Sequence, residues 1–102
     1  MIKLHSQNRS TIPIELYRSI THLKGNRLKV YFSEKSKTII FSENMKKGLI
    51  VQIGEVLIDY KHRILFQEYL LELISKLLQG DLNDLYFCLN QKCELCIKRV
   101  PK

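Results

Sequence analysis

The chain has 102 residues, of which 45% are hydrophobic and 26% are charged, and its formal net charge is +7. This composition is typical of a folded domain and excludes an intrinsically disordered chain. No apolar run approaches the roughly 20 residues that span a bilayer, and the N-terminus lacks the apolar core of a secretory signal. We therefore expect one intracellular, cytoplasmic domain over residues 1–102, without a membrane partner.

The first elements are predicted from the spacing of apolar residues. Alternation over residues 2–6 predicts a short strand with one buried face. A helix is predicted next, with Ser10 or Thr11 as its cap, Pro13 in its first turn and Gly25 as a left-handed stop. Its apolar positions recur at helical spacing: Ile12, Leu16, Ile20 and Leu23.

A β-hairpin is predicted after Gly25, because residues 28–32 alternate and residues 33–37 form a turn before the strand 38–41. Residues 44–48 form the most polar connection. Beyond it, 49–53 and 56–58 are apolar and β-branched, and Gly54 between them indicates a turn or a bulge.

The second half predicts a stronger helix, which Gly80 ends, and a second hairpin over residues 83–100. The apolar stripe of this helix is wide and indicates a core position. Its members are Phe66, Tyr69, Leu70, Leu73, Ile74, Leu77 and Leu78.

The two halves repeat one pattern of an extended segment, a helix, a glycine and a hairpin. A shift of 54 residues places Arg9 on Arg63 and Ile20 on Ile74, and a shift of 55 places Gly25 on Gly80. A unit of this size cannot bury its own apolar face. The predicted fold class is therefore α+β, with two pseudo-symmetric strand–helix–β-hairpin repeats, 1–48 and 49–102, packed as one swapped-hairpin-like domain.

The segment Asn8-Arg9-Ser10-Thr11-Ile12-Pro13-Ile14-Glu15-Leu16 resembles the swapped-hairpin domain of the AbrB/SpoVT and MazE-type regulators. The resemblance covers residues 2–41, with an echo in 56–100, and implies tandem divergent copies of a domain that is usually a DNA-binding homodimer. Asn8 and His62 stand where that family favours Gly, and Asn tolerates the left-handed conformation better than His does.

Positive charge is concentrated in the first half of the chain. Residues 1–50 carry ten Lys and Arg against three Glu, whereas residues 51–102 carry seven basic and seven acidic residues. This asymmetry indicates a polyanion-binding face or, alternatively, a solubilising Lys-rich surface. The resemblance implies that Arg9 and Arg18 contact DNA. Charge alone adds the remaining candidates: Lys3, Lys24, Arg27 and Lys29. The alternative is that Arg9 and Arg63 brace the repeat interface through backbone carbonyls or Glu15.

The cysteines Cys88, Cys93 and Cys96 form the one other cluster. Strand alternation sends Cys93 and Cys96 to opposite faces, and only His62 could join them through folding, so we expect no metal. Free thiols and a disulfide from Cys88 both stay open. The histidines have no nucleophile beside them and the four glycines form no phosphate loop, so we expect neither an enzyme nor a cofactor.

The favoured function is that of a small non-enzymatic DNA-binding regulator, acting as a monomer or a homodimer through a basic first repeat. The alternative is a protein- or peptide-binding module that uses the groove between the repeats or a free sheet edge at residues 49–53. The small size and the absence of alanine also resemble the uncharacterised proteins of archaeal filamentous viruses, which would place the protein in the host cytoplasm.

Overall fold

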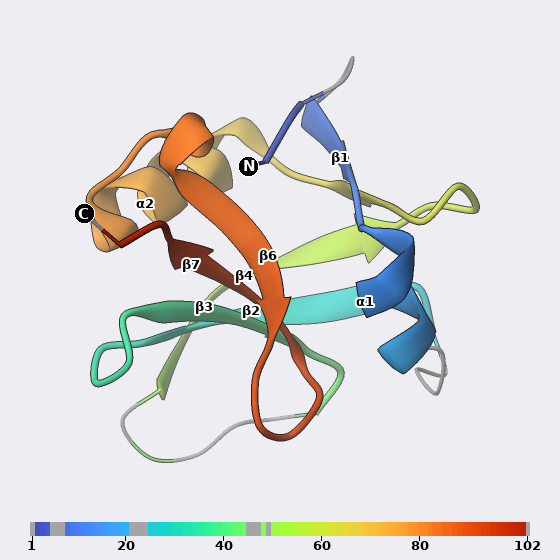
Figure 1. Cartoon of the computed structure of the whole chain (residues 1–102), viewed down its shortest axis with the longest axis horizontal. Helices are drawn as coiled ribbons and strands as arrows, with labels where there is room; N and C mark the ends of the chain where they lie inside the picture. The colour runs from blue at the N-terminus through green and yellow to red at the C-terminus, as the bar shows by residue number, and fades with distance from the viewer. Residues whose placement is uncertain (1, 5–7, 21–24, 45–47, 49, 102) are drawn as a thin grey trace.

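Strands from both halves of the chain pair into a single antiparallel sheet that curls into a half-barrel (Figure 1). The computed structural model describes residues 2–4, 8–20, 25–44, 48 and 50–101. Within these residues the strand order is β1-β5-β4-β2-β3-β7-β6. The strands are β1 (Arg9–Thr11), β2 (Arg27–Ser33), β3 (Thr38–Ser42), β4 (Ile50–Ile58), β5 (Arg63–Leu65), β6 (Leu85–Leu89) and β7 (Leu95–Arg99). The helices are α1 (Ile14–Ser19) and α2 (Glu68–Leu78), and a 3-10 turn, η2, spans Leu82–Asp84.

The predicted α+β fold class is wrong, because the described residues form mostly sheet with two short helices. Strand pairing joins the two halves directly, because β1 pairs with β5 and β3 pairs with β7. The β1–β5 register places Ser10 opposite Ile64, 54 residues later in the chain. The division into repeats at residues 48 and 49 stays a prediction.

The first predicted helix is shorter than its apolar spacing suggested. Pro13 is the N-cap, and α1 spans only six residues to Ser19. Ile12 and Ile20, the outer described members of the stripe, are buried but lie outside the helix. The helical spacing therefore spans three backbone conformations: a strand end, one helical segment and a loop. The predicted left-handed stop at Gly25 is also wrong, because its φ is not positive.

Two other helix and strand predictions have different outcomes. The predicted strand over residues 2–6 is absent from 2–4, and 5–7 lie outside the described residues. The second helix is confirmed as α2, which buries Leu70, Leu71, Ile74 and Leu78. However, the left-handed residue after it is Gln79, with φ 57°, and not Gly80.

The core fills the inner face of the curled sheet, and α2 covers it. Leu28, Val30, Ile39 and Ile97 from the central strands are at most 1% exposed, as is Leu70 from α2. A smaller buried cluster lies on the outer face and includes Tyr31, Ile40 and Cys96. The Tyr31 hydroxyl donates a hydrogen bond to the carbonyl of Asn44 at 3.0 Å, which satisfies this buried polar group.

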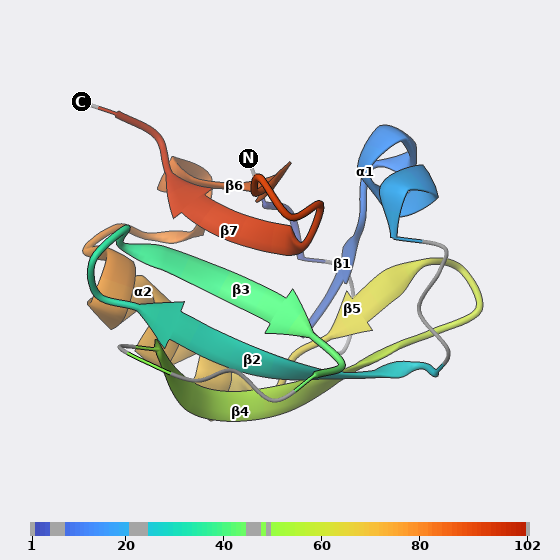
Figure 2. The ribbon, with the colours of Figure 1, turned by 90° about the horizontal axis from the view of Figure 1, so that it is seen from below.

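The edges of the sheet are partnered unequally. The Ile2 N–H donates to the carbonyl of Leu85 in β6, at 3.0 Å. In contrast, β4 pairs with β2 along most of its length but meets β5 only at Leu57 and Ile58, as Figure 2 shows. Its register against β2 shifts between Val30 and Tyr31, which confirms the bulge predicted near Gly54. No helix among the described residues is long and apolar enough to cross a membrane.

Candidate nucleic-acid interface

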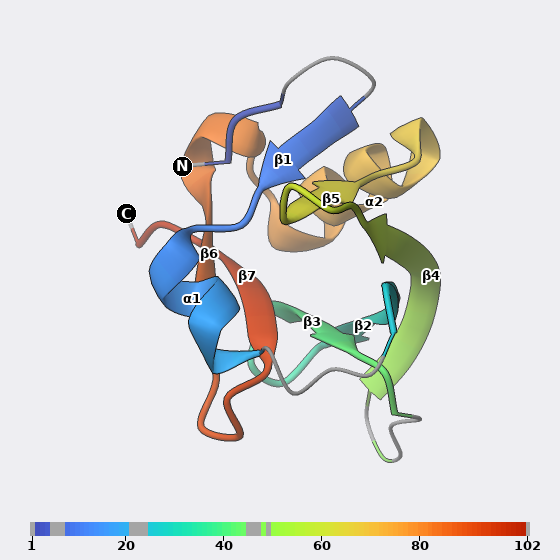
Figure 3. The ribbon, with the colours of Figure 1, turned by 90° about the vertical axis from the view of Figure 1, so that its right-hand side faces the viewer.

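Three separate parts of the chain meet around a cavity of about 300 Å³ at one side of the molecule. They are α1, the two residues before β2, and the β4–β5 turn, and Figure 3 shows α1 and this turn on the same side. The cavity is lined by Tyr17, Ile20, Gly25, Asn26, Ile58, Asp59 and Tyr60. Aromatic, amide and apolar groups therefore surround one space.

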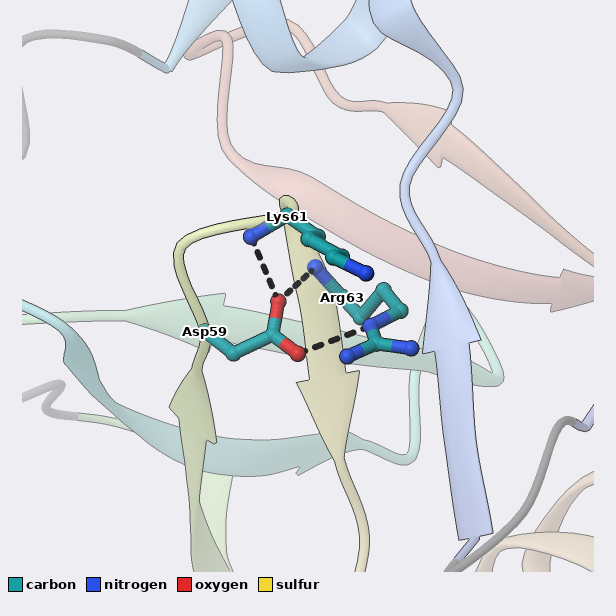
Figure 4. Close-up of polar contacts among 3 residues, drawn as sticks. All are labelled: Asp59, Lys61 and Arg63. Atoms are coloured by element: carbon teal, nitrogen blue, oxygen red, sulfur yellow. Dashed lines mark hydrogen bonds and ion pairs between the residues drawn. The ribbon is translucent and has the colours of Figure 1, made fainter.

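The β4–β5 turn is held rigid by the carboxylate of Asp59, which occupies its inside (Figure 4). One oxygen accepts the backbone N–H groups of Lys61 and Arg63, each at 2.9 Å. The other accepts Nε of Arg63 at 2.8 Å. Burial acts to raise the pKa of Asp59, but these hydrogen bonds and the charge of Arg63 outweigh it and hold that pKa below its ordinary value.

A stacked pair of rings fixes the turn against α1. The rings of Tyr17 and His62 lie 3.7 Å apart between centroids, with an angle of 16° between their planes. His62 has a φ of 60°, so its backbone is left-handed, as is that of Asn8 with φ 57°. The stacking energy helps to offset the strain of this conformation at a residue other than Gly.

Tyr60 projects from the braced turn into solvent and is 85% exposed. The Nζ atom of Lys61 lies 5.7 Å from the centroid of its ring, at cation–π distance. Exposing a large aromatic side chain to water is unfavourable, and Tyr60 is exposed on a turn that hydrogen bonds hold in place. The turn therefore presents a tyrosine ring and a cation together.

Each of the three parts that line the cavity is followed in sequence by a basic residue. Arg18 follows Tyr17, Arg27 follows Asn26, and Lys61 follows Tyr60, and all three are exposed. Arg27 forms an ion pair with Glu55 at 3.2 Å, but 68% of its side chain remains exposed. An exposed pair of this kind contributes little to stability and leaves Arg27 available to a stronger anion.

The other predicted DNA contacts are placed differently. Lys3 is exposed beside Ile2, whose N–H bonds to β6, and Lys24 lies outside the described residues. Lys29 is half-buried in β2 opposite Glu55 and Ser42. Arg9 is half-buried in β1, and its Nε atom is shielded from solvent without a hydrogen-bond partner in the described part of the chain. Of the six predicted residues, Arg18 and Arg27 are next in sequence to residues that line the cavity, and Arg27 itself lines a different pocket, with Glu55 and Gln67.

The bracing role proposed for Arg63 differs from its observed role. The Arg63 side chain forms an ion pair with Asp59, four residues earlier, while its backbone lies opposite Thr11 in the β1–β5 pairing. Sequence reasoning did not single out Tyr60 and Lys61, because they lie in the electrically neutral half. The available signal was a short polar run, Asp59–His62, between two apolar segments, which is typical of an exposed turn.

The cysteines do not form a disulfide. Cys88 and Cys96 lie directly opposite one another on β6 and β7, and Cys93 is exposed in the turn between them. Burial raises the pKa of Cys88 and raises that of Cys96 to about 12. No group of three or more His, Cys, Asp or Glu residues in the described ranges could hold a metal ion.

No protein-family model, curated protein or solved structure matches the chain.

Proposed function

We propose that this protein is a non-enzymatic nucleic-acid-binding domain, with DNA as its favoured ligand, which binds through the cavity side of the molecule. The observation that carries the proposal is that Arg18, Arg27 and Lys61 are all exposed and that each follows in sequence a residue that lines the cavity. The resemblance of residues 8–16 to DNA-binding regulators gives the same expectation independently.

The charge of the whole chain supports this proposal. A net charge of +7 attracts a polyanion over long range, and phosphate contacts by Lys and Arg release counterions. Binding of this kind provides affinity that falls steeply as salt increases, without base specificity. Asp59 adds little repulsion, because Arg63 and two backbone N–H groups compensate its charge.

The test is the double variant Arg18→Ala, Lys61→Ala, measured by fluorescence anisotropy with a labelled generic duplex and a labelled single strand. We expect both side chains to contact phosphates. Removing them should weaken binding and lower the magnitude of the slope of log K against log salt by about two for the duplex. Titrations at about 50 and 200 mM salt suffice to define the slope.

A matched control removes the same charge from the other side of the molecule. Lys35 lies in the β2–β3 turn and Lys76 on α2, both exposed and distant from α1 (Figure 1). Lys35→Ala, Lys76→Ala should change the slope much less. Equal losses in the two double variants would show that only total charge matters, and no binding by the unaltered protein at the lower salt would contradict the proposal itself.

The second candidate function is peptide binding by strand addition, and the unequal pairing of β4 favours it. In the part of the chain that the structure describes, residues 50–56 of β4 have a strand partner on the β2 side alone. Val51 on this segment is 64% exposed, and the strand carries no Lys or Arg, the usual protection of a free edge. An extended apolar peptide fits this edge.

Selection from a displayed random peptide library tests the second function. We expect extended peptides with alternating apolar residues, whose binding is lost in Val51→Lys, because a lysine at the edge disfavours pairing. Val100→Lys is the control, since Val100 is also exposed, at 46%, but follows β7. Selected peptides that bind the Val51→Lys variant equally well would exclude the β4 edge as their site.

A further inference from the structure

We propose that the cavity beside Tyr60 takes an unpaired nucleobase, so that the preferred ligand is single-stranded nucleic acid or a duplex with an unpaired segment. This inference rests on the proposed nucleic-acid binding and deepens it by naming the form of the ligand. It concerns a contact to a base, whereas the proposed function requires only contacts to phosphates.

Tyr60 is presented to solvent in the manner of a stacking platform. A stacking platform needs an aromatic face that is open to solvent and a backbone that does not move when the base arrives. The side chain is 85% exposed, and the turn that carries it is braced by three hydrogen bonds to Asp59 and by the stack of His62 on Tyr17. The folded protein therefore orders the turn that carries Tyr60 before any ligand binds.

The wall of the cavity combines aromatic rings with an amide. Tyr60 and Tyr17 line it from two different elements, and Asn26 lines it from a third. The Asn26 carbonyl accepts the N–H of Ile58 at 2.7 Å, which fixes this residue against β4. Its exposed side-chain amide offers a donor and an acceptor, the two groups that read the edge of a base. A planar, partly polar ligand matches this wall.

Exposed cations follow the lining residues in sequence. Arg18, Arg27 and Lys61 each stand one residue after a member of the lining, so long basic side chains are available to the phosphates beside a base held in the cavity. Lys61 lies over the Tyr60 ring and strengthens its contact with an electron-rich partner as well as with phosphate. In a continuous duplex the base faces are already stacked on one another, so Tyr60 would find no free face.

The experiment uses the absence of tryptophan from the chain. Tyr60→Trp introduces the one tryptophan of the chain at the platform, and its selectively excited emission should be quenched when an oligothymidylate single strand binds. Tyr60→Ala should weaken binding of this strand by about tenfold to a hundredfold, and Tyr60→Phe should retain it, because stacking needs the ring and not the hydroxyl.

The matched control is Tyr69→Ala, which removes the other strongly exposed tyrosine, 56% exposed on α2. It should leave affinity unchanged. If Tyr60→Ala binds the single strand as tightly as the unaltered protein, or if the Tyr60→Trp emission does not change at saturation, the base-stacking inference is overturned while phosphate binding stands. If the unaltered protein binds neither strand nor duplex, the proposed function fails as well.

Discussion

At the residue scale, Asp59 explains how a four-residue turn can present an exposed tyrosine. Its side chain is only 15% exposed, and its ionised form accepts three hydrogen bonds from Lys61 and Arg63. Hydrogen bonds to a charged acceptor are about twice as strong as those between neutral groups. The ionised carboxylate therefore stabilises the folded turn, and the stabilisation should depend on pH.

Asp59→Asn should lower the free energy of unfolding by about 1–3 kcal/mol at neutral pH, because all three donors lose their charged acceptor and an amide nitrogen cannot accept a hydrogen bond. The pKa of Asp59 is lowered in the folded state from 3.8, so the unfolded chain binds the proton more readily. The contribution of the carboxylate is complete above pH 3.8 and is lost as pH falls through the lower folded pKa. Urea unfolding of both proteins at neutral and acidic pH measures this difference.

The control for this prediction is Glu34→Gln. Glu34 also pairs with a cation, Lys37 at 3.1 Å, but both side chains are mostly exposed, at 76% and 63%. Exposed pairs contribute about 0–1 kcal/mol, so this variant should change stability little at any pH. The role of the ionised carboxylate would be contradicted if Asp59→Asn and the unaltered protein differed in free energy of unfolding by the same amount in acid as at neutral pH.

At the element scale, the β6–β7 hairpin places its three cysteines in two different environments. Cys93 occupies the turn with a φ of 59° and is exposed. Cys96 is fully buried in β7, opposite Cys88 of β6, and desolvation raises the pKa values of both thiols, that of Cys96 to about 12. The reacting species in alkylation is the thiolate. Burial in the sheet therefore suppresses the reactivity of Cys88 and Cys96, whereas Cys93 is accessible to the reagent.

Iodoacetamide at about pH 8, near the ordinary pKa of a thiol, should therefore modify Cys93 quickly and the other two cysteines slowly until the protein unfolds. Peptide mass spectrometry of samples taken over time measures each site. Cys93→Ser should have no rapidly modified cysteine. Rapid modification of Cys96 in the folded Cys93→Ser variant would show that the hairpin opens.

The two helices differ in how well the sequence predicted them. The long periodic stripe of α2 predicted that helix, because Leu70, Ile74 and Leu78 recur on one face within a single element. The same spacing in the first half did not predict the bounds of α1, because Ile12 and Ile20 reach the core from outside that helix. Periodicity reports which side chains are buried, and it identifies a helix only when the backbone between them is continuous.

At the scale of the whole molecule, the candidate site is assembled from three parts of the chain that are distant in sequence. Tyr17, Asn26 and Tyr60 are brought together by the pairing of β4 with β2 and by the stack of α1 on the β4–β5 turn. The family resemblance implied Arg18 as a DNA contact, and the positive charge of the first half added Arg27. Lys61 belongs to the neutral half, and the sequence-based division by charge could not assign it to the same surface.

The sequence by itself determined the strands β2, β3, β6 and β7, the helix α2 and the overall positive charge, because these depend on local periodicity and composition. Tertiary structure alone decided that short segments such as β1 and β5 become strands, because three residues are stable in a strand only when a partner satisfies their backbone groups. It also decided which residues line one cavity. Side chains from α1 and the β4–β5 turn and the two residues before β2 share that cavity because the sheet curls, and no local pattern encodes that curvature.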